Sequence, residues 1–151
     1  MLGGFQLIAE KGATFVSRGD NSGTHIMEEN LLREIGMEEL SDSWYISSGQ
    51  GMGDVILMAN ELEGYTLTDR GTYLLMLKNT SLEIMVEGDP RLFNYYGVIA
   101  VNPDKGPHIH GQGAALFVDW ILSEETQQLI SEFGMEEFGM PLFYPNDQQG
   151  H

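Results

Sequence analysis

Residues 15–25 read FVSRGDNSGTH, a short apolar stretch followed by a polar, glycine-containing loop and then by a helical pattern. Phe15 and Val16 favour a β-strand, and the spacing of apolar residues from Thr24 onward favours a helix. A strand that enters a helix through such a loop leaves free backbone N–H groups at the positive end of the helix dipole. The stretch therefore predicts a site for an anion.

The same pattern occurs twice more. Residues 44–53 read WYISSGQGMG and residues 65–72 read YTLTDRGT, and a helical pattern follows each of them. Strands and helices that alternate in this way are typical of α/β proteins. We therefore expect a three-layer α/β fold, with a sheet between helices on both faces.

Apolar spacing and turn residues predict the individual elements. We expect helices over residues 5–10, 24–35, from the Gly49–Gly53 loop to 62, 70–77, 114–122 and 124–133. We expect strands over residues 14–17, 43–46 and 65–68, β-rich segments over 82–86 and 95–101, and an extended piece over 141–145. The segment 102–111 resembles a linker, so we expect an α/β domain over residues 13–101 and a helical segment over residues 102–145.

Charge limits the possible partners. Seven Lys and Arg residues against 23 Asp and Glu residues give a net charge of −16. This charge repels polyanions over most of the surface, so we expect no nucleic-acid partner. A site for a small anion stays possible because Arg18 and Arg70 lie inside the polar loops. There, nearby hydrogen-bond donors outweigh the repulsion from distant negative charges, which salt screens.

Composition excludes further chemistry. The chain has no cysteine, which excludes disulfides, thiolate metal sites and thiol catalysis. His25, His108 and His110 have no further ligand at useful spacing, so we expect no metal site and no cofactor. Residues 1–4 lack the basic and apolar regions of a signal peptide, so we expect no leader in this chain, and no apolar run approaches the roughly 20 residues that cross a bilayer.

The loop at 18–24 has the donors that a tetrahedral oxyanion needs. A fully deprotonated oxyanion offers only acceptors, so its site should consist of donors. Arg18 supplies a guanidinium that can donate two parallel hydrogen bonds, and Ser22 and Thr24 supply hydroxyls. Asp20 is an acceptor, and we expect it to pin Arg18 or to cap a helix.

Other interpretations of these loops remain open. Ser22, Gly23 and Thr24 are also a typical helix cap and turn. Asp69 and Arg70 favour an ion pair that stabilises a helix start over direct contact with a ligand. The Gly49–Gly53 loop resembles a phosphate loop without its lysine. Two functions therefore stay open: a binding module for a small oxyanion, and an enzyme that acts on a phosphorylated or sulfated small molecule.

The chain resembles one family. Besides the runs SRGDNSGTH at 17–25 and YTLTDRG at 65–71, it has VIAVNP at 98–103, FVDW at 117–120 and FG at 133–134. This set closely resembles the solute-binding proteins of tungstate ABC transporters, which have the type 2 periplasmic binding protein fold. The resemblance implies a periplasmic or extracellular protein of two lobes that close on tungstate or molybdate and deliver it to a membrane permease.

The resemblance also implies roles for single residues. Arg18, Ser22 and Thr24 would bind the oxyanion together with the Gly23 and Thr24 amides. The residues expected to support these ligands from behind are Ser17, Asp20, Asp69 and Arg70. Nothing in the chain matches the anion loop of the first lobe. The chain therefore resembles the second lobe, about residues 13–88, together with the stretch that crosses back and packs on the first lobe. We then expect the apolar faces of the C-terminal helices to be exposed and to mediate a homodimer.

Overall fold

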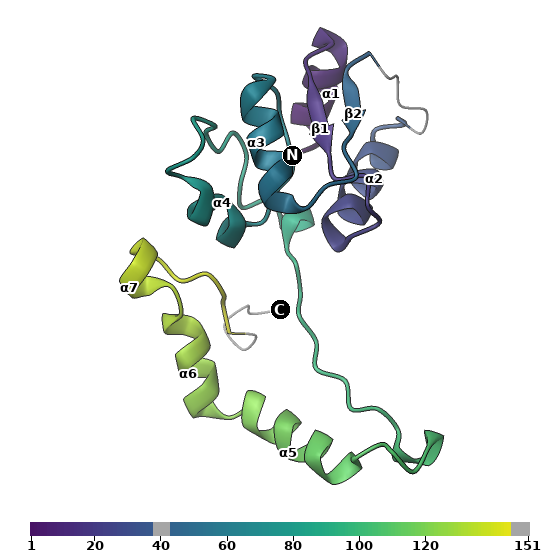
Figure 1. The fold of residues 1–151 in the computed structure, drawn as a ribbon, viewed down its shortest axis with the longest axis vertical. Helices are drawn as coiled ribbons and strands as arrows, with labels where there is room; N and C mark the ends of the chain where they lie inside the picture. The colour runs from purple at the N-terminus through teal and green to yellow at the C-terminus, as the bar shows by residue number, and fades with distance from the viewer. Residues whose placement is uncertain (38–42, 146–151) are drawn as a thin grey trace. The chain divides into compact units, whose positions relative to one another are not determined.

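The structure is a computed structural model that describes residues 1–37 and 43–145. The chain divides into two compact units (Figure 1). The first unit is Met1–Asn94, and the second begins at Tyr95. The functional division that we expect at residues 101–102 remains a prediction.

The first unit is built on two parallel strands. In chain order its elements are α1 (Leu2–Lys11), β1 (Phe15–Ser17), α2 (Gly23–Glu34), β2 (Tyr45–Ser47), α3 (Met52–Glu61), α4 (Arg70–Met76) and the short 3₁₀ turn η1 (Pro90–Leu92). β1 pairs with β2 in the register Phe15 with Tyr45, Val16 with Ile46 and Ser17 with Ser47. A parallel pair needs a crossover between its strands, and α2 is that crossover.

The sheet is covered on both faces. Phe15 packs in one core cluster with residues of α1 and α2, and with the residue before β2: Phe5, Leu31, Leu32 and Trp44. Val16, the next residue of β1, packs in a second cluster with Val55 and Ala59 of α3. Successive residues of a strand point to opposite faces, so α1 and α2 cover one face and α3 covers the other (Figure 1). The predicted three-layer α/β fold is confirmed.

The third predicted strand, at residues 65–68, is reduced to a single parallel bridge between Phe15 and Tyr65. Its backbone bonds are Tyr65 N–H to the Thr14 carbonyl and Val16 N–H to the Tyr65 carbonyl, both at 2.8 Å. The Thr66 hydroxyl then donates to the Val16 carbonyl at 2.8 Å. Because this side chain takes the acceptor that the next ladder bond would use, the backbone leaves the sheet after one residue.

The predicted β-rich segments at 82–86 and 95–101 form no strand in the described chain, and this expectation was wrong. A strand needs a neighbour that accepts and donates its backbone hydrogen bonds, and within the described residues neither segment pairs with one. Before the first segment, the Asn60 side-chain oxygen accepts from Ser81 N–H at 2.7 Å and from the Thr80 hydroxyl at 3.0 Å, which ties this stretch to α3 without strand pairing.

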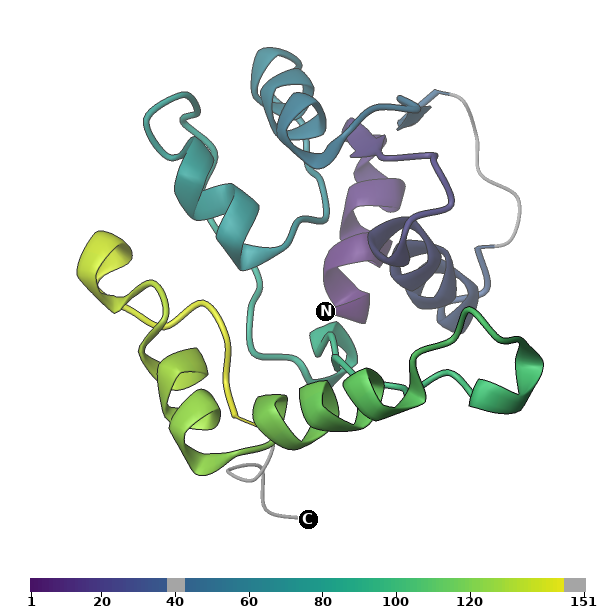
Figure 2. The same cartoon turned by 60° about the horizontal axis from the view of Figure 1, so that its bottom comes forward.

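Over residues 95–145 the second unit forms a short 3₁₀ turn and three helices, η2 (Pro103–Lys105), α5 (Gly111–Ile121), α6 (Glu124–Glu132) and α7 (Met135–Phe138). Figure 2 shows the helices following one another along the chain. The helices predicted at 114–122 and 124–133 are confirmed, and Ser123 caps α6 by accepting from Thr126 N–H at 3.4 Å. Among the described residues, no helix has the length and apolar character that spanning a bilayer requires.

Apolar side chains remain exposed in the second unit. α5 has no buried residue, and Phe117 and Trp120 of this helix are 52% and 54% exposed although their rings contact each other. Phe133, Phe143 and Tyr96 form a small aromatic cluster with centroid separations of about 6 Å, yet Phe133 is also more than half exposed. The expectation that the C-terminal helices expose an apolar face is met in the described chain.

Candidate functional site

Three loops follow the carboxyl ends of β1, β2 and the Tyr65 bridge. The loop after β1 carries Arg18, and the loop after β2 begins at Ser48. Ser48 N–H and the Ser48 hydroxyl both donate to the Ser17 carbonyl, at 3.0 and 2.8 Å, so these two loops start side by side. Carboxyl ends of parallel strands are where α/β sheets bind their ligands.

Gly19 fits the first loop tightly against the second. Its φ is +61°, in the left-handed region, and a Cβ placed on it would come within 1.9 Å of the Ser47 hydroxyl oxygen. Any larger residue would therefore combine an unfavourable backbone angle with a steric clash. This close approach fixes the direction in which Arg18 and Asp20 leave the sheet.

The start of α2 presents open donors. Ser22 is the N-cap, and its hydroxyl oxygen accepts from His25 N–H at 3.4 Å. In the described part of the chain, no acceptor pairs with the N–H groups of Gly23 and Thr24 or with the Thr24 hydroxyl. Asn21, which has a left-handed φ of +59°, donates its N–H to His25 Nδ1 at 3.0 Å and so closes the turn before the helix. The site residues predicted from the sequence, Ser22, Gly23 and Thr24, thus stand together at a helix N-terminus.

Arg18 lies beside this helix start and is paired with Asp20. Its Nη2 donates to Asp20 Oδ2 at 2.5 Å, which is the pairing expected from the sequence. Its Nε is buried, and no partner for it lies within residues 1–37 and 43–145. A buried N–H without an acceptor is costly, so the guanidinium retains a donor that a ligand could use.

Asp20 serves as an internal counter-charge for the loop. Its Oδ1 accepts from Ser22 N–H at 3.1 Å and its Oδ2 accepts from Arg18. The pKa of this carboxyl falls to about 2, mainly through the hydrogen bond from the Ser22 hydroxyl and further through the Ser22 N–H and Arg18. The aspartate therefore stays ionised and occupies donors that an oxyanion would also seek.

A second open helix start follows the second loop. α3 begins after Gly51, which provides no side-chain cap, and the Ser48 hydroxyl oxygen accepts from Gln50 N–H at 3.2 Å. Gly49 before it has a left-handed φ of +66°. The Gly49–Gly53 loop therefore also ends at an uncapped helix, although it brings no cation of its own.

Asp69 and Arg70 have structural partners in the third loop. The Asp69 carboxylate caps α4, accepting from Thr72 N–H and from the Thr72 hydroxyl at 2.8 Å each. Arg70 Nη2 lies 3.3 Å from Glu87 Oε2 in an exposed pair. Both residues thus have stabilising contacts, but Arg70 forms its ion pair with Glu87, and Asp69 stabilises the helix start as a cap. Their support of the oxyanion site remains a prediction.

A buried polar cluster that was not predicted from the sequence lies beneath the loop. Glu28 is 1% exposed, and its carboxylate accepts from the Tyr45 hydroxyl at 2.5 Å. Ser17, which is fully buried, also hydrogen-bonds to it. One signal was available: Glu28 lies three and four residues before Leu31 and Leu32, on the apolar face of the predicted helix.

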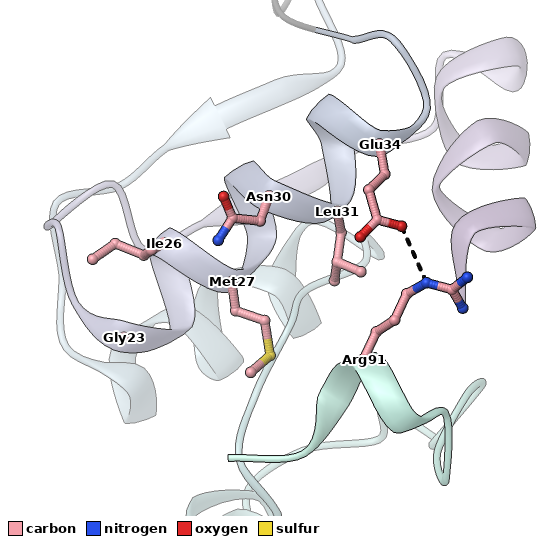
Figure 3. A pocket seen from close by; sticks show the side chains of 7 residues that line it. All are labelled: Gly23, Ile26, Met27, Asn30, Leu31, Glu34 and Arg91. Atoms are coloured by element: carbon pink, nitrogen blue, oxygen red, sulfur yellow. Dashed lines mark hydrogen bonds and ion pairs between the residues drawn. The ribbon is translucent and has the colours of Figure 1, made fainter. Parts of the chain in front are cut away.

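A hollow of about 290 Å³ lies along α2, lined by Gly23, Ile26, Met27, Asn30, Leu31, Glu34 and Arg91 (Figure 3). Its arginine is already neutralised, because Arg91 Nε lies 3.1 Å from Glu34 Oε2 and its Nη1 lies 3.2 Å from Asp89 Oδ1. This hollow therefore lacks the available cation that the donor loop has. Within the described residues, no three His, Asp or Glu side chains gather as a metal ion would require.

Comparison with known proteins gives the class. A family model described as a PBP superfamily domain matches residues 5–125. The chain belongs to the PBP superfamily.

Particular relatives are tungstate-binding proteins. The chain is 51% identical over 146 residues to the tungstate-binding protein TupA of Peptoclostridium acidaminophilum, covering 97% of this chain and 51% of the relative. Two solved structures are each 46% identical. The tungstate-binding protein TupA from Desulfovibrio alaskensis G20 has a TM-score of 0.78 and coverages of 94% and 58%. The tungstate ABC transporter from Geobacter sulfurreducens has a TM-score of 0.74 and coverages of 85% and 54%. The chain thus spans little more than half the length of these relatives.

Proposed function

We propose that this chain binds a small tetrahedral oxyanion, tungstate first and molybdate next, as part of the solute-binding component of an ABC transporter. One observation carries the proposal: Arg18, with an unpartnered buried Nε, stands beside the open N-terminus of α2. The similarity to proteins named as tungstate-binding supports the identity of the ligand. Tungstate is thus a ligand that suits both the donor chemistry and the relatives.

The proposed contacts are the guanidinium of Arg18, the hydroxyls of Ser22 and Thr24, and the N–H groups of Gly23 and Thr24. The Ser22 hydroxyl and Arg18 Nη2 are held by Asp20 in the ligand-free loop. An oxyanion would therefore use Arg18 Nε and the two free amides first, and would take over Asp20 contacts as it settles. Ser17 and Asp20, and more distantly Asp69 and Arg70, would support these donors.

This donor set discriminates between oxyanions by their protons. Tungstate and molybdate near neutral pH carry no proton, whereas phosphate retains one that needs an acceptor. A site made of donors leaves that proton unpaired, at a cost of about 1 to 3 kcal/mol. The acceptor nearest these donors, the Asp20 carboxylate, is already engaged by Arg18 and Ser22.

Parallel calorimetric titrations of the chain with tungstate, molybdate, sulfate and phosphate test the ligand. We expect tungstate and molybdate to bind more tightly than phosphate by roughly five- to a hundredfold. Phosphate binding tighter than tungstate would contradict the proposal and would favour an enzyme that acts on phosphorylated substrates.

We propose that the chain binds without catalysis. The relatives are named as binding proteins, which fits this role. Incubation of the chain with phosphorylated and sulfated small molecules should release no phosphate or sulfate. Release that is lost in an Arg18→Ala variant would overturn the proposal.

In the whole protein, we propose that residues 13–101 form the oxyanion-binding lobe and that residues 102–145 pack on the other lobe. The complete protein would lie in the periplasm or outside the cell and pass its ligand to a membrane permease. Because the chain spans about half of its relatives, its own affinity for tungstate should be weaker than that of a protein with both lobes.

We further propose that the isolated chain forms a homodimer through its C-terminal helices. Phe117 and Trp120 are more than half exposed, and a soluble monomer rarely leaves a large apolar face uncovered. Sedimentation of the chain and of a Phe117→Ser, Trp120→Ser variant tests this. The parent should sediment as a dimer and the variant as a monomer, and a monomeric parent at high concentration would refute the dimer.

A further inference from the structure

The strongest unexplained feature lies beneath the donor loop. Glu28 of α2 is 1% exposed and shares its helix face with Leu31 and Leu32 of the core. Carboxyl groups are rarely buried unless they are hydrogen-bonded, and burial in a core favours their neutral form. A glutamate placed here therefore needs a reason that apolar packing does not supply.

The hydrogen bonds of Glu28 lead to the oxyanion loop. Its Oε1 accepts from the Tyr45 hydroxyl of β2 at 2.5 Å, and Ser17 of β1 bonds to the same carboxyl. The Ser17 hydroxyl oxygen in turn accepts from Gly19 N–H at 3.1 Å. Ser17 therefore stands between the Glu28 carboxyl, on whose pKa it acts, and Gly19, the residue that follows Arg18.

The surroundings of Glu28 shift its pKa in opposite directions. Burial raises the pKa of this carboxyl, whereas the hydrogen bonds from Tyr45 and Ser17 lower it by smaller amounts. The other groups whose charge reaches it lie on the same helix: His25 lowers the pKa and Glu29 raises it. Burial, and then the bond to Glu28, raises the pKa of the Tyr45 phenol well above its ordinary range, so Tyr45 remains a donor.

The position of Glu28 makes its charge relevant to an anion. Glu28 lies five residues after Gly23, about 7.5 Å along the axis from the first turn of α2. A carboxylate at that depth would oppose an oxyanion at the helix start, and a neutral carboxyl would not. The protonation state of Glu28 thus affects both the electrostatic potential at the oxyanion site and the hydrogen bond between Ser17 and Gly19.

We propose that Glu28, Tyr45 and Ser17 form a positioning cluster that sets the geometry of residues 18–24 and couples oxyanion affinity to the protonation of Glu28. The coupling rests on the proposed oxyanion function, whereas the control of loop geometry does not. Glu28 touches no ligand in this scheme and acts through Ser17 and through its charge. Because oxyanion binding favours the neutral carboxyl, affinity falls as the pH rises through the pKa of Glu28.

Amide NMR of the isotope-labelled chain tests both parts. In the ligand-free protein, between about pH 5 and 8.5, the Gly19 amide should titrate with a pKa above that of an ordinary glutamate. It should not titrate in Glu28→Gln, which keeps an acceptor for Tyr45 but carries no charge. Glu29→Gln, a partly exposed neighbour that lacks these bonds, is the matched control. Its Gly19 amide should still titrate, with a midpoint lowered only by the loss of the Glu29 charge.

The same samples measure affinity for tungstate. As the pH rises through the pKa that the Gly19 amide reports, the parent should lose about threefold to tenfold in affinity, and Glu28→Gln should change less than about twofold over the same range. A Ser17→Ala variant separates the two routes: the Gly19 amide should cease to titrate, while the pH dependence of tungstate binding carried by the charge of Glu28 persists.

Several results would overturn the inference. A Gly19 amide that does not titrate in the parent, or that titrates equally in Glu28→Gln, would refute control of the loop. Equal pH profiles of tungstate affinity in the parent and Glu28→Gln would refute the coupling. If Glu28→Gln does not fold, the Ser17→Ala variant tests whether the cluster controls the loop. A Gly19 amide that titrates in this variant as in the parent would refute that control. A parent that binds no tungstate at any pH would refute the proposed function and the coupling with it, while the ligand-free titration still decides the positioning role.

Discussion

The two units of the chain share amphipathic helices but differ in what those helices cover. In the first unit, Phe15 and Leu32 are almost fully buried between helix and sheet. In the second unit, Phe117 and Trp120 lie on a regular helix and remain more than half exposed. The comparison teaches that apolar periodicity predicts a helix reliably, whereas burial depends on a partner that the periodicity does not supply.

Truncating one aromatic residue in each unit should give the largest contrast. Phe15→Ala removes a ring from the core of the first unit and should lower the free energy of unfolding by about 3 to 5 kcal/mol. Phe117→Ala, its control in the second unit, should change it by less than about 0.5 kcal/mol when both variants are measured at concentrations too low for the proposed dimer. Urea denaturation measures both. Equal losses would mean that Phe117 is buried in solution and would break the comparison.

A smaller contrast is expected between two arginines of the first unit. Arg18→Ala should weaken tungstate binding by about 1.5 to 3 kcal/mol, because a charge-assisted donor is lost, and Arg18→Lys should recover little since the planar fork is absent. Arg91→Ala removes a guanidinium already paired with Glu34 and Asp89, so affinity should stay near that of the parent. Calorimetry decides between them. Equal losses in the two alanine variants would point to general electrostatics in place of a specific site.

Helix caps sharpen the comparison further. Asp69→Ala removes two 2.8 Å bonds at the start of α4 and should destabilise the first unit by about 1 kcal/mol. Ser123→Ala removes the 3.4 Å cap of α6 and the bonds of the Ser123 hydroxyl to the Trp120 carbonyl at 2.8 Å and to the Thr126 hydroxyl at 3.1 Å. It should still cost less, because α6 belongs to the more exposed unit, where fewer contacts depend on the helix start. Thermal denaturation followed by circular dichroism compares the two variants. A larger loss for Ser123→Ala would indicate that the second unit is the better packed of the two.

The smallest expected effect concerns acid stability. Asp20 has its pKa lowered to about 2, so its contribution is present above its ordinary pKa near 3.8 and is lost as the pH falls toward 2. The melting temperature should therefore fall less between about pH 5 and 2.5 in Asp20→Asn than in the parent. Asp104→Asn in the second unit is the control and should follow the parent. A drop in Asp20→Asn as steep as the parent's would refute this role of Asp20.

Local patterns predicted much of the first unit. The alternation of strands and glycine loops predicted the α/β fold, and the donor pattern brought Arg18, Ser22, Gly23 and Thr24 to one helix start. These features depend on residues that are close together in the sequence, so local sequence patterns are enough to predict them. The pairing of Asp20 with Arg18 was also expected, because the two residues are only two positions apart.

Features that depend on distant partners were missed. Glu28 was not singled out, because its place on the apolar face of α2 indicates burial but not the contacts with Tyr45 and Ser17. The segments 82–86 and 95–101 have the composition of strands but lack a pairing partner in the described chain, and composition cannot supply one. The third strand ended early because the Thr66 side chain competes with the ladder, a detail of geometry and not of propensity.

The two tryptophans fall one to each unit, and this gives the molecule two optical reporters. Trp44 is 8% exposed, stacked edge-on against Tyr45 in the first core, whereas Trp120 is 54% exposed on α5. An indole shielded from water emits at shorter wavelength and resists iodide quenching, and an exposed one does the reverse. The fluorescence of single-tryptophan variants would thus report the unfolding of the α/β unit and the burial of α5 as separate events in the same chain.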